Sequence, residues 1–114
     1  MVEVLYTDEF GAWFDDLDEG AQEATADVVT ALEKAGVALG YPLSSAIKGS
    51  RIALRELRVQ SSGRPLRVFY AFDPARQAVL LIGGDKTGDN RFYERMIPVA
   101  ERIWREYLTE TGQR

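Results

Sequence analysis

The sequence predicts an α+β fold in which a helical hairpin precedes a run of strands and a final helix ends the domain. Three observations support this prediction. Apolar residues recur at helical spacing in residues 7–35 and again in residues 90–109. Between them lie short apolar runs separated by turn-forming residues. The predicted element order is β-α-α-β-β-β-α, in a single domain covering residues 1–114.

The N-terminal part is predicted to be a short strand followed by two helices. Residues 2–6 favour a strand, and Thr7 or Asp8 is the expected N-cap of the first helix. The first helix has a strongly aromatic buried side, formed by Phe10, Trp13, Phe14 and Leu17. After a tight turn, the second helix is expected over residues 21–35, and Gly36 stands where a left-handed C-cap belongs.

The middle of the chain is predicted to form the strands of a sheet. Residues 36–50 mix Gly, Pro and Ser with scattered apolar residues, which predicts an irregular connection. Strands are expected over three segments, Arg51–Gln60, Leu66–Asp73 and Gln77–Ile82. The last segment is almost continuously apolar, as is typical of a strand buried on both faces, and Gly83 and Gly84 are expected to end it.

Residues 90–109 are predicted to be an amphipathic helix. Its buried stripe comprises Phe92, Met96, Val99, Ile103 and Tyr107, widened by Ala100, Trp104 and Leu108. Asp89 or Asn90 is the expected N-cap. Because Pro98 lacks the amide hydrogen of the helical ladder, we expect the helix to kink or to begin again there.

Composition excludes several classes of function. The chain has no Cys and no His, which removes disulfides, thiolate catalysis, Cys-based zinc sites and the commonest general base. Ser and Thr nucleophiles have no imidazole to activate them, and neither a metal site nor a cofactor is expected. The sequence shows no signal peptide and no apolar run long enough to span a membrane, so we expect a cytoplasmic protein.

Charge is distributed in blocks along the chain. Residues 1–47 carry a net charge of −9, residues 48–76 carry +5 and residues 77–114 are neutral, in a chain of net charge −4. The acidic block is expected either to be a solvated helix surface or to face a partner. An acidic pI argues against non-specific binding of duplex DNA, but not against a local RNA site. Residues 48–76 are therefore the predicted functional segment.

Strand alternation places Arg67 on a sheet face beside apolar residues. A cation there needs a groove or an acidic partner, and Glu56 on the preceding strand is available. Two hypotheses stay open for Arg67, a structural ion pair with Glu56 and a functional role. Lys48, Arg51 and Arg64 lie near strand ends or turns, where a solvated surface role competes with a specific contact.

Four features in order along the chain carry a family resemblance. They are Leu57-Arg58, the strand Arg67-Val68-Phe69-Tyr70, an apolar strand followed by Gly83-Gly84-Asp85-Lys86, and Tyr93 at the start of the last helix. Together they resemble the RelE/HigB superfamily, and the phage-derived Gp49-like, HigB-type group in particular. The resemblance implies a RelE-like fold with a short N-terminal strand, a helical hairpin, an antiparallel sheet and a C-terminal helix.

The resemblance also implies a toxin of a type II toxin–antitoxin system, an endoribonuclease that cleaves mRNA on the ribosome and inhibits translation. Its expected partners are the ribosome, mRNA and a cognate antitoxin, a helix-turn-helix protein encoded next to it. By position, Arg67 is expected to contact the scissile phosphate and Lys86 to steady the transition state. Tyr93, or Phe92 by register, is expected to stack on a base or to assist proton transfer. RNA contacts are expected from Arg58, Arg55, Arg51, Lys48 and Arg64.

The general base stays open at this point, because the chain has no His. Lys86, Asp85 and Tyr93 are the alternatives. Two other functions also stay open. One is a non-catalytic RNA- or ribosome-binding module with steep salt dependence, and the other is a protein-interaction domain that docks a partner on its aromatic helix surfaces. No membrane partner, and no specific DNA binding by this chain alone, is expected.

Overall fold

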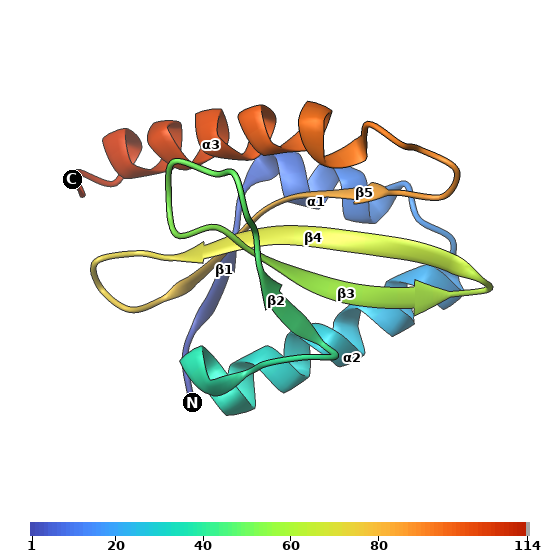
Figure 1. Ribbon diagram of the computed structural model, residues 1–114. Coiled ribbons are helices and arrows are strands. Elements are labelled where there is room, and N and C mark those ends of the chain that lie inside the picture. Colours follow the sequence, from blue (N-terminus) through green and yellow to red (C-terminus); the bar gives the residue numbers. More distant parts are fainter. Residues whose placement is uncertain (114) are drawn as a thin grey trace.

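A computed structural model describes residues 1–113 and shows a five-stranded sheet with helices packed against it (Figure 1). The elements are β1 (Val4–Tyr6), α1 (Asp8–Asp15), α2 (Glu19–Ala35), the 3₁₀ turn η1 (Gly36–Ala38), β2 (Ser44–Ala46), β3 (Arg55–Ser61), β4 (Arg64–Phe72), β5 (Ala78–Asp85) and α3 (Phe92–Glu110). This order confirms the predicted α+β class and the succession β-α-α-β-β-β-α. The short strand β2 is an addition, within the segment predicted to be irregular.

The strands are arranged in the order β1-β5-β4-β3-β2. Strands β2 to β5 pair antiparallel, whereas β1 pairs parallel with β5, so the sheet is mixed. The prediction that Gly83 and Gly84 end the last strand was wrong, because β5 continues through both to Asp85. Both glycines give room to rings from the helix layers. A Cβ on Gly83 would collide with the Trp13 ring, and a Cβ on Gly84 would lie 2.7 Å from the Phe92 ring.

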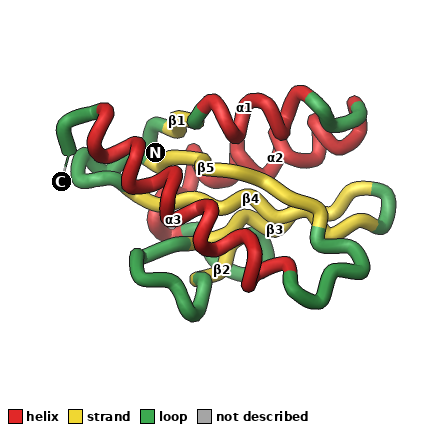
Figure 2. Tube along the Cα trace, turned by 90° about the horizontal axis from the view of Figure 1, so that it is seen from above, coloured by secondary structure: helices red, strands yellow, loops and turns green. Residues whose placement is uncertain are grey.

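Each face of the sheet carries its own apolar core. Helices α1 and α2 cover one face, and α3 lies on the other (Figure 2). The core under α1 and α2 includes Phe10, Leu32, Leu57, Val59, Val68, Tyr70 and Leu80. The core under α3 includes Leu54, Phe69, Ala71, Leu81, Phe92, Ile103 and Trp104. The alternation predicted for β4 is therefore confirmed, with Val68 and Tyr70 on one face and Phe69 and Ala71 on the other.

The helix ends follow from side-chain chemistry. Thr7 caps α1 as predicted, and Asp18 caps α2, which begins two residues earlier than the predicted residue 21. Helix α3 begins at Phe92 without a side-chain cap and passes through Pro98 as one element, so the predicted new start at Pro98 was wrong. Pro98 and Glu94 are both exposed, and water can therefore satisfy the Glu94 carbonyl that Pro98 leaves without a partner.

Two kinds of site are absent from residues 1–113. None of the helices there is long and apolar enough to cross a membrane. The same residues contain no group of three or more His, Cys, Asp or Glu side chains that could hold a metal ion.

Candidate functional site

Glu56 stands at the centre of a charged cluster on the α3 side of the sheet. It lies on β3 and is 4% exposed. Arg67 Nε on β4 is 3.5 Å from Glu56 Oε1, and Arg58 Nη1 on β3 is 3.5 Å from Glu56 Oε2. The sheet register sets Arg58 directly opposite Arg67. Because like charges facing each other across strands repel, the Glu56 carboxylate stabilises the placement of both cations.

Two hydroxyl groups also hold the Glu56 carboxylate. Tyr93 Oη, at the start of α3, donates to Oε1 at 2.6 Å, and Ser45 Oγ on β2 donates to Oε2 at 2.9 Å. Burial of the phenol, together with its hydrogen bond to Glu56, raises the pKa of Tyr93 above the ordinary value. Tyr93 therefore keeps its proton at neutral pH and acts as a hydrogen-bond donor.

Lys86 adds a third cation to this cluster. It follows β5, and its Nζ lies 5.2 Å from the centre of the Tyr93 ring. The Tyr93 ring is itself fixed by edge contacts with Phe69 and Phe92. The three residues predicted to be catalytic thus converge from β4, from α3 and from the segment after β5. We call the group formed by Glu56, Arg58, Arg67, Lys86, Tyr93 and Ser45 the Glu56 cluster.

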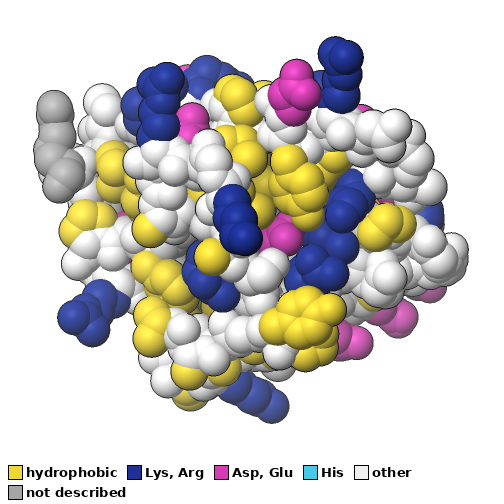
Figure 3. All heavy atoms as spheres, in the orientation of Figure 1, with side chains coloured by type: hydrophobic (Ala, Val, Ile, Leu, Met, Phe, Trp, Pro, Cys, Tyr) yellow, Lys and Arg dark blue, Asp and Glu magenta, His cyan; other side chains and the backbone are white. Residues whose placement is uncertain are grey.

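Access to the Glu56 cluster is uneven. The Arg58 side chain is 30% exposed, whereas Arg67 is only 4% exposed. Within residues 1–113, Arg67 Nε is buried and has no hydrogen-bond partner of good geometry. A cavity of about 510 Å³ borders Arg58 and Arg67, and its other walls come from α2 and the segment before β2, including Asp27 and Val28. Figure 3 shows Lys and Arg side chains gathered around an acidic side chain over β3 and β4. An anion that entered here would meet the Arg58 guanidinium first, because Arg67 Nε is buried against Glu56.

Arg55 lies on the opposite face of the sheet, away from the Glu56 cluster. Its Nε and Nη2 donate to Ser44 Oγ at 3.2 and 3.1 Å, and its Nη2 donates to the Leu39 carbonyl at 3.4 Å. Ser44 Oγ is in turn 2.6 Å from Tyr70 Oη, inside the core under α2. The Arg55 guanidinium is therefore engaged in a structural network.

None of the three other basic residues predicted to contact RNA makes an ion pair with Glu56 within residues 1–113. Arg64, at the turn between β3 and β4, pairs with Asp18 at 2.7 Å and so ties this turn to the start of α2. Arg51 and Lys48 are exposed on the loop between β2 and β3. Of the five residues predicted to bind RNA, the structure brings only Arg58 to the cluster.

Comparison with known proteins agrees with the sequence motifs. The family model described as "Phage derived protein Gp49-like (DUF891)" matches residues 12–105. The chain belongs to this Gp49-like family. It is 38% identical over 106 residues to "Putative toxin HigB2" of Mycobacterium tuberculosis, covering 90% of this chain and 53% of that protein. It is 37% identical over 107 residues to "Putative toxin HigB3" of the same organism, covering 92% of each.

The chain therefore spans about half the length of the HigB2 relative and nearly all of the HigB3 relative. These matches confirm the family resemblance read from the motifs. No solved structure matches the chain.

In this Gp49-like protein, Glu56 and Ser45 are members of the cluster that the sequence did not assign to chemistry. The sequence marks Glu56 only as a partner for Arg67, and Ser45 lies in the segment predicted to be irregular. Asp85, one of the alternatives for the general base, accepts hydrogen bonds from Thr87 and is not part of the Glu56 cluster. The Thr87 hydroxyl and N–H both donate to it, which lowers the pKa of Asp85 and keeps it in an exposed turn.

Proposed function

We propose that this Gp49-like protein is the toxin of a type II toxin–antitoxin pair and that it inhibits translation by cleaving mRNA on the ribosome. One observation carries the proposal: in the Glu56 cluster two arginines and a phenol meet one buried carboxylate, and Lys86 lies over the ring of that phenol. The names of the HigB relatives support the toxin role. The proposed partner is a helix-turn-helix antitoxin encoded beside the gene, and the proposed place of action is the cytoplasm.

Cleavage of RNA through its 2′-hydroxyl requires a base, and we assign this role to Glu56. Its carboxylate takes the proton of the 2′-hydroxyl while the 2′-oxygen forms a bond to the neighbouring phosphorus. An ionised carboxylate has lone pairs beyond those used by Tyr93 and Ser45, so it can accept this proton. General acid–base help of this kind is worth roughly 10²- to 10⁴-fold in rate.

We assign to the three cations the stabilisation of the negative charge that develops on the phosphorane. Arg67 offers a desolvated Nε that has no hydrogen-bond partner within residues 1–113. Arg58 and Lys86 lie on the more exposed side of the cluster. A preorganised donor of this type contributes about 2.7–4 kcal/mol to transition-state stabilisation in comparable oxyanion sites.

Tyr93 is assigned as the acid for the departing 5′-oxygen. Its raised pKa keeps the phenol protonated until the bond between phosphorus and the 5′-oxygen breaks. The products are a 2′,3′-cyclic phosphate and a 5′-hydroxyl. The 2.6 Å hydrogen bond between Tyr93 and Glu56 then lets Glu56 return its proton to the phenolate, which resets both groups without a His.

The low exposure of Arg67 favours a second candidate, an RNA- or ribosome-binding module that does not cut. In that function Arg58 and Lys86 hold the RNA backbone, and Arg67 serves only as the partner of Glu56. Of the aromatic surfaces in the third hypothesis, Phe10 and Trp104 are buried in the cores, whereas Trp13, Phe14, Tyr107 and Leu108 are half-buried against them. They give no support to a docking function.

The test is inducible expression of the protein with and without the neighbouring gene, scoring growth and mapping mRNA 5′ ends. We expect growth arrest and new 5′ ends only without the antitoxin, and neither effect from the variant Arg67→Ala with Lys86→Ala. Arg102→Gln is the matched control, because Arg102 is exposed and its ion pair within residues 1–113 is with Glu106 alone. Growth arrest without new 5′ ends would favour the binding module. The toxin proposal fails if the wild type and the double variant both leave translation and mRNA intact.

A further inference from the structure

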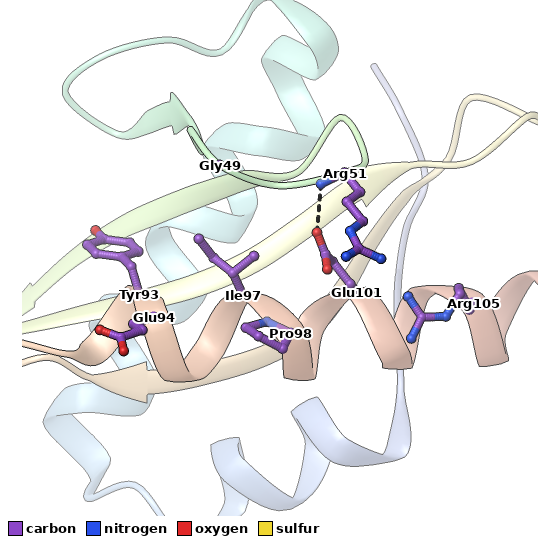
Figure 4. A pocket seen from close by; sticks show the side chains of 8 residues that line it. All are labelled: Gly49, Arg51, Tyr93, Glu94, Ile97, Pro98, Glu101 and Arg105. Atoms are coloured by element: carbon purple, nitrogen blue, oxygen red, sulfur yellow. Dashed lines mark hydrogen bonds between the residues drawn. The ribbon is translucent and has the colours of Figure 1, made fainter.

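A second cavity, of about 420 Å³, lies beside the Glu56 cluster, between α3 and the loop of residues 47–54. Tyr93 belongs to both the cavity and the Glu56 cluster. Its ring lines the cavity, while its hydroxyl holds Glu56. Figure 4 shows the lining residues of α3 in a row beneath the loop. An RNA strand bound at the Glu56 cluster would therefore pass the mouth of this cavity.

The loop wall of the cavity is fixed by Glu101 on α3. Glu101 is 8% exposed, and its carboxylate accepts from the Arg51 N–H at 2.7 Å and from Ser50 Oγ at 2.8 Å. The backbone N–H of Ile47 also donates to the Leu54 carbonyl at 2.9 Å, which closes the base of the loop. The cavity is therefore built into the fold and does not depend on a free loop.

Two arginines at one end of the cavity have guanidinium groups available for a ligand. Within residues 1–113, the side chains of Arg51 and Arg105 make no ion pair and no hydrogen bond. The hydrogen bonds from the Arg51 N–H and the Ser50 hydroxyl lower the pKa of Glu101, and the charges of Arg51 and Arg105 lower it further, without a direct contact from either guanidinium within residues 1–113. Figure 4 shows both groups near Glu101, one from the loop and one from the helix. Two guanidinium groups placed in this way favour a phosphate, because each can donate two parallel hydrogen bonds.

The other end of the cavity suits a nucleobase. Ile97 and Pro98 supply an apolar surface next to the Tyr93 ring, against which a base can pack. Glu94 precedes Pro98 by four residues, so both lie on the same side of α3, and Glu94 is exposed. A carboxylate accepts a hydrogen bond from an exocyclic amino group such as N4 of cytosine, whereas the O4 carbonyl of uracil repels it.

The two ends of the cavity lie about three helical turns apart along α3. Positions 94 and 105 lie about 16 Å apart along a helix axis. The side chains of Arg105 and Glu94 both extend toward the helix N-terminus (Figure 4). A nucleotide lying along the row would have Glu94 at its base end and the two arginines toward its phosphate end.

We propose that this cavity binds a nucleotide adjacent to the one that is cut, and that it selects a base carrying an exocyclic amino group. The base packs on Ile97 and Pro98 and donates to Glu94, while its phosphate is held by Arg51 and Arg105. The inference rests on the proposed RNA function and adds a specificity site to it.

The test is titration of the purified protein with 2′-O-methyl tetranucleotides of cytosine and of uracil, followed by fluorescence anisotropy. These oligonucleotides lack the attacking hydroxyl and cannot be cut. We expect the cytosine tetramer to bind about fivefold tighter or more, from a discrimination of ~1–3 kcal/mol. Glu94→Gln should bring the ratio to about one, because an amide can donate to uracil O4. Arg51→Gln with Arg105→Gln should weaken both tetramers equally.

Arg102→Gln with Glu106→Gln is the matched control on the same helix and should leave both affinities unchanged. Equal binding of the two tetramers, binding of neither, or a preference that survives Glu94→Gln would overturn the proposal. Binding to uncleavable RNA also separates this inference from the proposed function. If the protein prefers the cytosine tetramer but cleaves no mRNA in cells, the specificity site is supported and the nuclease function is rejected. If the protein cleaves mRNA in cells but binds the two tetramers equally, only the proposed role of the cavity is rejected.

Discussion

The two faces of the sheet are closed in different ways. Helix α2 packs on β3 and α1 packs on β5, so together they cover one face from side to side. Helix α3 packs on β5 and β4. The α3 side of β3 carries Glu56 and Arg58, and there the polar groups pair with one another and with α3 through Tyr93. The first face is mostly apolar, with one polar network around Arg55, whereas the second is apolar beneath α3 and charged around Glu56.

Arg55 and Arg67 show what this difference means for single residues. Both are arginines on central strands, and both have polar partners. Arg55 donates to neutral oxygens of a network that only holds the loop and β2 against the core. Arg67 faces a carboxylate, a phenol and two more cations, a set that can transfer protons and receive a phosphate. Chemistry is therefore expected only where a helix leaves the sheet uncovered.

The largest effect is expected from Arg67→Ala. This change leaves the buried Glu56 carboxylate without one partner, and we expect a loss of about 3 kcal/mol in the free energy of unfolding. Cleavage per folded molecule should fall about 100-fold or more, because one donor to the phosphorane is lost. Urea unfolding and mRNA cleavage with purified ribosomes are the measurements.

Arg55→Ala is the matched change on the other face. It should lower the free energy of unfolding by about 1–3 kcal/mol through lost hydrogen bonds and leave cleavage per folded molecule unchanged. Equal losses of cleavage in the two variants, after correction for the folded fraction, would show that the two faces do not differ in function.

Tyr93→Phe comes next, with Tyr107→Phe as its control on the same helix. Each tyrosine donates to a carboxylate, Tyr93 to Glu56 at 2.6 Å and Tyr107 to Asp73 at 2.9 Å. Both substitutions should cost about 1 kcal/mol of stability. Only Tyr93→Phe should also lower the cleavage rate, by about 100-fold, since it removes the proposed acid. A similar drop in Tyr107→Phe would point to a general effect of α3 on the fold.

The sequence predicted most of the fold because periodicity reports local structure directly. The aromatic spacing of α1 and the apolar run of β5 are visible without knowledge of their neighbours. Strand β2 gave no such signal, because it has three residues and is defined by its pairing with β3. The limits of β5 were misplaced since Gly83 and Gly84 are typical turn residues. Their place in a strand depends on rings that arrive from α1 and α3.

The candidate site could be predicted only in part for a related reason. Strand alternation separates Arg55 from Arg58, but it does not say which face a helix will cover. Arg67, Lys86 and Tyr93 came from the family resemblance and do lie together. The central position of Glu56 depends on groups from four separate segments of the chain, so no local pattern contains it.

The paired glycines of β5 offer a smaller test of the same contrast. Gly83→Ala would displace Trp13, and Gly84→Ala would displace Phe92, the neighbour of Tyr93. Both changes should destabilise the fold by about 1–3 kcal/mol through overpacking. Gly84→Ala should in addition reduce cleavage per folded molecule, because a shift of Phe92 moves Tyr93 away from Glu56. If Gly83→Ala reduced cleavage by the same factor, the helical hairpin would also position the site.

The smallest effect concerns the pH dependence of the loop held by Glu101. Hydrogen bonds from the Arg51 N–H and the Ser50 hydroxyl lower the pKa of Glu101 below its ordinary value near 4.5. A carboxyl group whose pKa is lower in the folded state adds stability above the unfolded pKa, and that stability is lost as the pH falls through the folded pKa. Glu101→Gln should therefore be less stable than the wild type by about 1 kcal/mol at pH 7, and this difference should shrink in acid.

Urea unfolding of both proteins at neutral and acidic pH measures that difference. Glu106→Gln is the control, because Glu106 is exposed and pairs only with Arg102. We expect this control to show no comparable difference at either pH. If the gap between the wild type and Glu101→Gln stayed constant in acid, the loop would be held by shape and not by the charge of Glu101. The loop of residues 47–54 would then be held on α3 by packing and neutral hydrogen bonds, and the charge of Glu101 would have no structural role there.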